Sequence, residues 1–308
     1  MSHFSFFTEL VALPMSEMLF RGVAPALVTP FTASDEVDLD AFKRLIEAQI
    51  DGGVAGLVVL GTTGENPTVT HEERRNLVAA AVEQAGERVP VIVGTGTNNT
   101  RQSIAFSEEA TEAGADALLV VGPYYNKPSQ AGFAAHVKAI AEATSAPIIL
   151  YNVPGRTSFN ITAETTLALA HEVDQVVGMK EASGDLAQIS DILAGRPDGF
   201  AVYAGDDEIS LPLCALGGDG CVSVISNAEP TAFSSMVGAA LEGDLDRARA
   251  EHFNLLPAMR ACFYETNPVP VKVVLAADGM MTPHVRLPLV DLDESNTTHD
   301  QILEAFGR

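Results

Sequence analysis

The chain has 308 residues, 47% of them hydrophobic, and it carries 41 acidic against 18 basic side chains. This length suits one large α/β domain with an appendage, and a net charge of -23 argues against binding to nucleic acid. No apolar stretch reaches the length of a membrane span, so no association with a membrane is expected. The acidic surplus fits a protein from a salt-rich cytoplasm, and it fits an ordinary acidic enzyme equally well.

Residues 1–19 are mildly apolar but have neither a basic leading segment nor a small-residue cleavage site. We therefore expect an N-terminal tail rather than a signal peptide. The three cysteines, Cys214, Cys221 and Cys262, form no C-x-x-C pair, so neither a disulfide framework nor a zinc site is indicated. A reducing compartment, the cytoplasm, is expected.

Short apolar runs alternate with amphipathic segments along most of the chain. The runs are continuously apolar, as strands are when both faces of a parallel sheet are covered. Eight of them predict β-strands, at residues 23–29, 56–61, 89–94, 117–122, 147–153, 176–180, 200–204 and 221–226. Between the runs, apolar residues recur every three or four positions, which predicts outer helices. Examples are Leu39–Asp51, His71–Ala85, residues 100–113 and residues 129–144.

Eight strand–helix units in a chain of this length predict a closed (β/α)8 barrel, the TIM barrel. A doubly wound open sheet is the alternative, but it more often carries G-x-G-x-x-G after the first strand, and residues 28–31 have none. Two further helical patterns, at residues 244–264 and 270–278, predict a C-terminal helical appendage. We therefore expect the barrel over residues 20–240 and a helical region over residues 241–308.

Polar motifs follow several of the predicted strands. Active sites of such barrels lie where the strands end, so we expect these side chains to meet at one face. The motifs are Gly61-Thr62-Thr63-Gly64-Glu65 after the second strand, Gly122-Pro123-Tyr124-Tyr125-Asn126 after the fourth, Tyr151-Asn152-Val153-Pro154-Gly155-Arg156-Thr157 at the fifth, Lys180 in the sixth and Gly205-Asp206-Asp207 after the seventh.

Lys180 ends an apolar strand, and burial disfavours the charged form of a lysine. A neutral amine can condense with a ketone to form a Schiff base. A nearby phenol can transfer protons, while hydroxyls, glycine-flanked amides and a guanidinium can hold carboxylates. Each motif alone also has a structural explanation. Lys180 could mark where a strand emerges into water, Gly61–Glu65 could be a turn that caps a helix, Tyr124 and Tyr125 could be rim aromatics, Arg156 could form a surface salt bridge, and Asp206-Asp207 could cap the next helix or be half of a metal site.

Taken together, these motifs resemble the dihydrodipicolinate synthase family of pyruvate-dependent class I aldolases and lyases. The resemblance runs in the same order from about residue 20 to about residue 290. It is carried by residues 61–65, 123–128, 151–157, 178–182, 267–272 and 286–289. It implies a lyase of lysine and diaminopimelate biosynthesis that joins pyruvate to L-aspartate 4-semialdehyde through a Schiff base. It implies no organic cofactor, no catalytic metal, and a homotetramer built as a pair of dimers.

The resemblance also implies roles for single residues. Lys180 matches the Schiff-base lysine, and Tyr151 matches the acid/base phenol beside it. Thr62 and Tyr125 match a proton relay, with Tyr125 expected to reach in from a neighbouring subunit. On the substrate side, Thr63, Val222, Gly205 and Arg156 match pocket positions, Thr63 at the carboxylate of pyruvate and Arg156 at that of the semialdehyde.

Arg156 bears on the alternative function, a pyruvate-dependent sugar-acid aldolase of the sialic acid lyase or keto-deoxy-gluconate aldolase type. Those families look similar around the lysine but typically lack an arginine two residues after this proline. A site built to pair with a carboxylate discriminates strongly, because an unpaired buried guanidinium is costly. A catalytically silent binding barrel is a further alternative, which the complete set of reactive residues disfavours.

In members of the family that lysine inhibits, a cluster at a subunit interface binds the effector. The matching positions here are Asn66, Pro67, His71, Arg74, Asn98, Gln102 and Tyr124. Gln102 stands where the inhibited members carry a glutamate that pairs with the ammonium group of lysine. A neutral amide loses that charge-assisted hydrogen bond, typically about 1.5–3 kcal/mol. We therefore predict weak or absent inhibition by lysine, so this cluster need not be functional.

Overall fold

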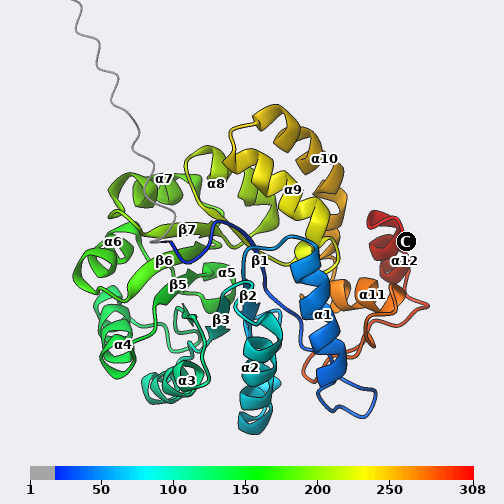
Figure 1. Cartoon of the computed structure of the whole chain (residues 1–308), viewed down its shortest axis with the longest axis horizontal. Coiled ribbons are helices and arrows are strands. Elements are labelled where there is room, and N and C mark those ends of the chain that lie inside the picture. The colour runs from blue at the N-terminus through cyan, green and yellow to red at the C-terminus, as the bar shows by residue number, and fades with distance from the viewer. Residues whose placement is uncertain (1–17) are drawn as a thin grey trace, which may run out of the picture.

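The computed structural model describes residues 18–308 and contains one sheet of eight parallel strands (Figure 1). Neighbours in the sheet follow the order β1-β8-β7-β6-β5-β4-β3-β2. The strands are β1 Gly22–Pro25, β2 Leu57–Val59, β3 Val91–Gly94, β4 Ala117–Val121, β5 Ile148–Asn152, β6 Val176–Glu181, β7 Ala201–Ala204 and β8 Gly220–Ser223. A parallel bridge between Ala26 and Val58 joins β1 to β2 and closes the ring. The predicted TIM barrel is therefore confirmed.

Each observed strand overlaps a predicted one, but several end earlier than predicted. The second strand shows the reason most clearly. It stops at Val59 because Leu60 has a left-handed backbone, with φ 58°, which an extended strand cannot contain. The chain therefore turns sooner into the motif that follows β2, and this motif lies wholly in a loop.

An outer ring of helices covers the barrel (Figure 1). Its members are α1 Leu39–Asp51, α2 His71–Ala85, α3 Thr100–Glu112, α4 Gln130–Ala143, α6 Ala163–Glu172, α7 Leu186–Gly195, α8 Ser210–Ala215 and α9 Pro230–Leu241. Single turns also occur at α5 Pro154–Thr157, Asn66–Thr68, Asp207–Ile209 and Ile225–Asn227. The start of α2 shows how local sequence sets a boundary. Thr70 Oγ1 accepts from the backbone N–H of Glu73 at 3.3 Å, and Glu73 Oε2 accepts from that of Thr70 at 2.7 Å.

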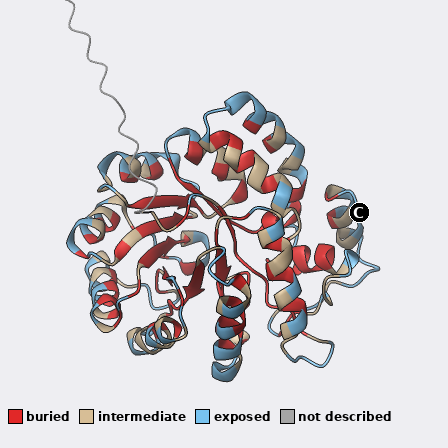
Figure 2. Cartoon of the chain, in the orientation of Figure 1, coloured by how far each residue is buried: buried red, intermediate tan, exposed pale blue. Residues whose placement is uncertain are grey.

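Two apolar layers stabilise the barrel. One lies between the strands and the outer helices, where residues such as Leu118, Phe133 and Phe233 are fully buried. The other fills the inside of the barrel with side chains such as Val58 and Tyr203. Figure 2 shows the strands as buried, with exposed residues on the outer faces of the helices. Successive residues of a strand serve these two layers in turn, which explains why the strands are continuously apolar.

Three helices follow the barrel: α10 Leu245–Ala261, α11 Val269–Ala277 and α12 Thr297–Ala305. The sequence predicts the first two, but the third was missed. Helix α12 is only nine residues long, and Ile302 is its one fully buried residue, so its apolar pattern is weak. It packs against α10 and α11 beside the barrel (Figure 1). The predicted N-terminal tail, residues 1–19, lies almost entirely outside the described residues.

Aromatic and ionic contacts hold the segments that precede β1, β7 and β8 at the amino ends of these strands, and the side chain of Tyr203 reaches this end from within β7. The rings of Phe20 and Tyr203 are stacked, with centroids 4.1 Å apart. The Tyr203 hydroxyl donates to the carbonyl oxygen of Phe20 at 2.8 Å, and burial raises the pKa of Tyr203. Nearby, Arg196 forms an ion pair with Asp219, whose carboxylate also accepts from the backbone N–H of Val202 at 2.8 Å.

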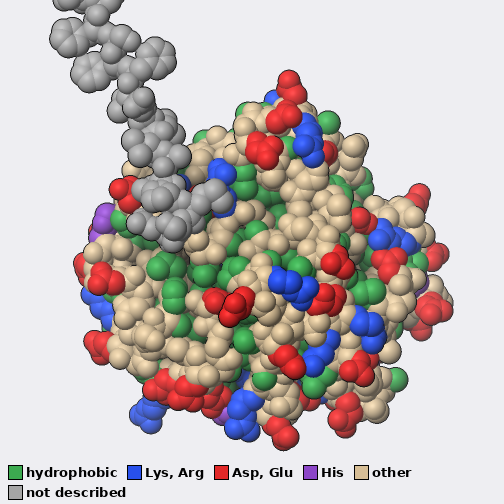
Figure 3. Space-filling view, in the orientation of Figure 1, with side chains coloured by type: hydrophobic (Ala, Val, Ile, Leu, Met, Phe, Trp, Pro, Cys, Tyr) green, Lys and Arg blue, Asp and Glu red, His purple; other side chains and the backbone are tan. Residues whose placement is uncertain are grey.

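On the face seen in Figure 3, acidic and basic side chains are interspersed. Within residues 18–308, no helix has both the length and the apolar character that crossing a membrane would require.

Candidate active site at the carboxyl ends of the strands

Strand β6 carries Lys180 into the barrel, where the residue is only 5% exposed. Lys180 is in register with Tyr151 on β5 and with Tyr203 on β7. Its Nζ atom lies 4.2 Å from the centre of the Tyr151 ring. The structure therefore brings together a buried amine and a buried phenol, the two groups that the sequence assigns to Schiff-base chemistry.

Gly205 follows β7 and makes room for this lysine. A Cβ atom at Gly205 would lie 2.9 Å from Lys180 Cε and 2.6 Å from Ala182 Cβ, both too close for a real side chain. Its backbone N–H donates to the carbonyl oxygen of Glu181 at 2.7 Å. In this chain, Gly205 thus shapes the space occupied by the lysine stem.

A buried carboxylate that sequence reasoning missed links the ends of β5 and β6. Glu181 is 1% exposed, and it accepts from Asn152 Nδ2 at 3.1 Å and Gln188 Nε2 at 2.9 Å. It also accepts from the backbone N–H of Ser183 at 2.7 Å. Glu181 immediately follows Lys180, and Asn152 immediately follows Tyr151, so this network holds the backbone next to both predicted catalytic residues. The one signal in the sequence was that Glu181 and Asn152 directly follow the two predicted catalytic residues.

The loop after β2 presents Thr62 and Thr63. Thr63 is 2% exposed, and its hydroxyl oxygen accepts from Asn267 Nδ2 at 2.9 Å. The carbonyl oxygen of Gly64 accepts from Thr29 Oγ1 at 2.7 Å. Thr62 is only half-buried and faces a cavity. The loop is therefore held from two sides while one hydroxyl stays accessible.

A cavity of about 300 Å³ opens at this end of the barrel. Its lining includes Thr62, Glu65, Tyr124, Arg156 and Asn267. Arg156 is exposed, and within residues 18–308 its guanidinium has no hydrogen bond or ion pair, unlike the predicted alternative of a surface salt bridge. Lys180 and Val222 are buried more deeply, at 5% and 1% exposure, and are not part of this lining.

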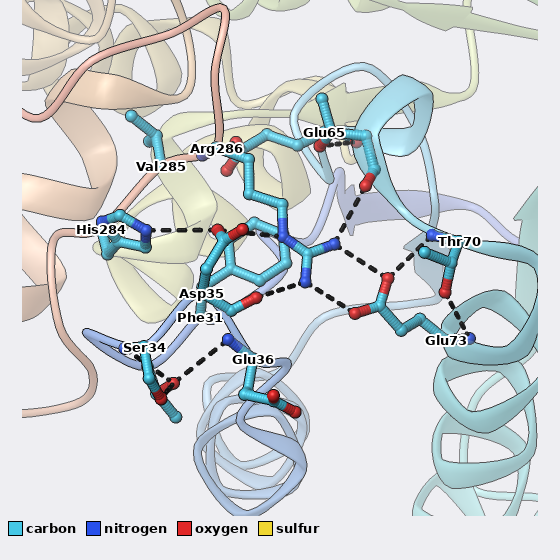
Figure 4. A network of polar contacts seen from close by, with 12 residues as sticks. Phe31, Ser34, Asp35, Glu36, Glu65, Thr70, Glu73, His284, Val285 and Arg286 are labelled. Atoms are coloured by element: carbon cyan, nitrogen blue, oxygen red, sulfur yellow. Dashed lines mark hydrogen bonds and ion pairs between the residues drawn. The ribbon is translucent and has the colours of Figure 1, made fainter.

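A larger hollow, of about 750 Å³, lies beside the first and shares Thr68, Arg286 and Leu289 with it. None of the predicted site residues lines it. Its wall is a network around Arg286, shown in Figure 4. Arg286 donates to Glu73 Oε2 at 2.8 Å and to the carbonyl oxygen of Thr68 at 2.9 Å. This hydrogen bond from Arg286 lowers the pKa of Glu73 to about 2. These groups already have partners, so we place the candidate site in the smaller cavity.

Tyr125 lies apart from the cavity of its own chain. It is 89% exposed and has a left-handed backbone with φ 71°. Its neighbour Tyr124 lines the cavity. The two adjacent tyrosines therefore point to different surroundings.

The positions that match a lysine-binding cluster are spread over several local contacts. Asn66 Nδ2 donates to the carbonyl oxygen of Leu60 at 3.0 Å, and His71 Nε2 lies 2.7 Å from Glu109 Oε1. Arg74 is buried over the ring of Phe106, and burial lowers its pKa to about 10. The carbonyl oxygen of Asn98 accepts from Asn126 Nδ2 at 2.9 Å. Gln102 and Pro67 are exposed. The 300 Å³ cavity is lined in part by Asn66, Pro67 and Tyr124.

Asp206 and Asp207 cap backbone groups, which is one of the two alternatives drawn from the sequence. Asp206 Oδ1 accepts from the N–H of Glu208 at 3.0 Å. Asp207 is 2% exposed and accepts from the N–H groups of Val224 and Ile225 at 3.1 and 2.9 Å. Burial raises the pKa of Asp207. In the part of the chain that the structure describes, no group of three or more His, Cys, Asp or Glu side chains is arranged to hold a metal ion.

A closed parallel barrel with a buried lysine and tyrosine at the carboxyl ends of its strands defines the class of protein, a (β/α)8-barrel enzyme. Residues 19–305 match the Dihydrodipicolinate synthetase family. The chain is 68% identical over 290 residues to the 4-hydroxy-tetrahydrodipicolinate synthase of Salinibacter ruber. The aligned region covers 94% of this chain and 96% of that relative.

Solved structures agree. The dihydrodipicolinate synthase of Thermotoga maritima superposes with a TM-score of 0.91 at 41% identity, covering 94% of this chain and 98% of that one. A chloride-inhibited dihydrodipicolinate synthase from Acinetobacter baumannii, complexed with pyruvate, gives a TM-score of 0.90 at 38% identity, covering 93% and 99%. The chain therefore belongs to the dihydrodipicolinate synthetase family, as its motifs predict. Its activity is that of a 4-hydroxy-tetrahydrodipicolinate synthase, a lyase.

Proposed function

We propose that this enzyme joins pyruvate to L-aspartate 4-semialdehyde and that Lys180 carries pyruvate as a Schiff base. The observation that carries the proposal is the burial of Lys180, 5% exposed, against the ring of Tyr151. An amine held inside the barrel beside a phenol is placed to act as a nucleophile towards the ketone of pyruvate. The pyruvate bound by the Acinetobacter baumannii relative supports the choice of first substrate.

The reaction proceeds in balanced steps. The Lys180 amine attacks the ketone carbon of pyruvate, and loss of water gives the Schiff base. A proton then leaves the methyl carbon, and the resulting enamine attacks the aldehyde carbon of the semialdehyde. The amino group of the semialdehyde finally displaces Lys180 from the imine carbon, and the ring closes as (4S)-4-hydroxy-tetrahydrodipicolinate.

Proton transfers fall to Tyr151, which is 5% exposed beside the amine, and to Thr62, which lines the cavity. Tyr125 completes the relay from a neighbouring subunit. Its exposure of 89% supports this role, because a tyrosine so far from any cover in its own chain is free to enter a partner. We propose a homotetramer built as a pair of dimers, in which the dimer is the smallest complete unit.

Substrate carboxylates are held on two sides. Thr63 binds the carboxylate of pyruvate, with Gly205 and Val222 lining the same end of the barrel. Arg156 receives the carboxylate of the semialdehyde, since its guanidinium lines the cavity and forms no hydrogen bond or ion pair with the residues that the structure describes. A sugar-acid aldolase would have no use for this charge, so no second function is proposed. The reaction takes place in the cytoplasm, which fits three free, buried cysteines.

Borohydride trapping tests the proposal. The enzyme is incubated with pyruvate, reduced and mapped by mass spectrometry. Lys180 gains one pyruvate-derived group, and Lys272, a second buried lysine at 0% exposure, serves as the internal control and stays unmodified. An unmodified Lys180 would contradict the mechanism. In steady-state assays, Arg156→Ala raises the KM for the semialdehyde far more than that for pyruvate, and equal losses would contradict its role.

The positions that match a lysine-binding cluster include Gln102, and they bear on inhibition by lysine. We propose that lysine inhibits weakly or not at all, because Gln102 offers a neutral amide to an ammonium group. Inhibition assays decide this point. Half-maximal inhibition at sub-millimolar lysine would show the inference to be wrong.

A further inference from the structure

Helix α11 holds the loop after β2 at two points. Asn267, just before the helix, donates to Thr63 Oγ1 at 2.9 Å. Lys272, within the helix, forms an ion pair with Glu65. The loop carries Thr62 and Thr63, to which the proposed function gives roles in proton transfer and in binding pyruvate. The C-terminal region thus reaches directly into the site.

The ion pair between Glu65 and Lys272 is buried and fully partnered. Glu65 is 4% exposed and Lys272 is 0% exposed. Lys272 Nζ also donates to the carbonyl oxygen of His284 at 2.8 Å and lies 4.4 Å from the centre of the Phe31 ring. The second oxygen of Glu65 accepts from the backbone N–H of Arg286 at 3.0 Å. Figure 4 shows Glu65 beside Arg286 in this arrangement.

Stability alone does not explain why such a pair occurs here. Taking two charges out of water is costly, and apolar residues of similar volume often replace a buried pair without loss of stability. The two side chains also bind backbone groups of His284 and Arg286, so the pair joins the loop after β2 to α11 and to the segment that follows α11.

The part of the loop that the pair holds is a strained turn. Glu65 has a left-handed backbone, with φ 52°, which is unfavourable for a residue with a side chain. Its N–H donates to the carbonyl oxygen of Thr62 at 3.1 Å, and its own carbonyl oxygen accepts from the N–H of Thr68 at 3.0 Å. The carboxylate therefore anchors the turn at the residue whose backbone is strained. This residue lies three positions from Thr62 and two from Thr63.

We propose that Glu65 is a positioning residue for the condensation: through its ion pair with Lys272 it holds the turn that presents Thr62 and Thr63 to the substrates. This inference rests on the proposed function, which assigns those hydroxyls their roles. Loss of the charge lets the turn relax, so that the relay and the carboxylate contact are misplaced. The Lys180 amine, on another strand, still reacts with pyruvate.

Two altered enzymes and one matched control test the inference. Glu65→Gln keeps the shape of the side chain and removes its charge. Glu65→Leu with Lys272→Met replaces the pair by apolar groups. The control is Asp219→Asn, which breaks the ion pair with Arg196 at the opposite end of the barrel. For each enzyme the melting temperature, kcat, the KM for pyruvate and the borohydride-trapped fraction at saturating pyruvate are measured.

In Glu65→Gln, kcat falls roughly ten- to hundredfold and the KM for pyruvate rises, because a small misplacement of catalytic groups is costly. Its trapped fraction at saturating pyruvate stays at the level of the unaltered enzyme. The apolar pair recovers the melting temperature but not kcat. Asp219→Asn lowers the melting temperature and leaves kcat unchanged.

The inference is overturned if Glu65→Gln keeps the kcat of the unaltered enzyme, or if kcat in the apolar pair returns together with stability. Should Glu65→Gln fail to fold, the apolar pair decides by the same criterion. Failure of the unaltered enzyme to trap pyruvate would instead contradict the proposed function, so the two failures are distinguishable.

Discussion

At the amino ends of the strands polar side chains are paired, whereas at the carboxyl ends several are not. Tyr203 is 0% exposed and donates to Phe20, and Arg196 is paired with Asp219. At the other end, the hydrogen bonds and ion pairs within residues 18–308 leave out the side chains of Lys180, Tyr151 and Arg156. Polar groups that the fold leaves without partners are available to a substrate, so we propose that one end of the barrel serves stability and the other serves the reaction.

The largest effect is expected at Tyr151, to which the proposed function gives a role in proton transfer. Tyr151→Phe keeps the ring beside Lys180 and removes only the hydroxyl. Loss of a proton-transfer group lowers kcat by about 10²–10⁴. Because the hydroxyl has no hydrogen bond to lose among residues 18–308, the urea concentration at the midpoint of unfolding does not change. Steady-state kinetics and urea titration together test this contrast, and a variant that loses stability without losing activity would break it.

A steric change near the amine gives the next effect. Gly205→Ala places a Cβ atom 2.9 Å from Lys180 Cε, so the lysine stem must shift. A displacement of this order costs roughly a hundredfold in rate, with slower formation of the pyruvate adduct. Stopped reduction by borohydride at short times measures that rate. The control is Gly238→Ala, because Gly238 has open space at its Cβ position and an ordinary backbone. Gly184→Ala is unsuitable, because Gly184 has a left-handed backbone with φ 75°.

At the amino ends the reverse is expected. Tyr203→Phe keeps the stacking on Phe20 but removes the hydroxyl, which leaves the Phe20 carbonyl oxygen without its donor. An unsatisfied buried acceptor costs about 1–3 kcal/mol of unfolding free energy. Urea denaturation measures this loss. The kcat is unchanged, and a clear fall in kcat would show that the two ends are not separate in function.

The smallest effect is expected in the network around Arg286, at Glu73. The pKa of Glu73 is lowered to about 2, below its ordinary value of 4.5. Its stabilising contribution is therefore present above the unfolded-state value and is lost as the pH falls through the folded-state value. Glu73→Gln is less stable than the unaltered enzyme at neutral pH, by about 1 kcal/mol for a partly exposed pair. The difference shrinks on acidification, and a difference that grows would contradict the assignment.

The barrel and the place of its site could be predicted because their signals are local. Continuous apolar strands and helical spacing are read within about ten residues of sequence, and the end of each strand then marks one face. This was sufficient to place Lys180, Tyr151 and Thr62 at the same end of the barrel. Helix α12 was missed because its apolar signal rests largely on Ile302.

The supporting contacts could not be predicted, because no local pattern encodes them. Lys272 meets Glu65 across 207 positions of sequence, and Asn267 meets Thr63 across 204. Nothing in the residues near Glu65 indicates which cation will neutralise it. Likewise, the exposure of Tyr125 becomes visible only when the loop after β4 is folded.

The pairing of Lys272 with Glu65 also has a consequence for the order of events during translation. Glu65 is synthesised 207 positions before Lys272, so its carboxylate cannot be buried against this partner until α11 has been made. The threonine turn can therefore reach its final shape only when nearly the whole polypeptide has been synthesised.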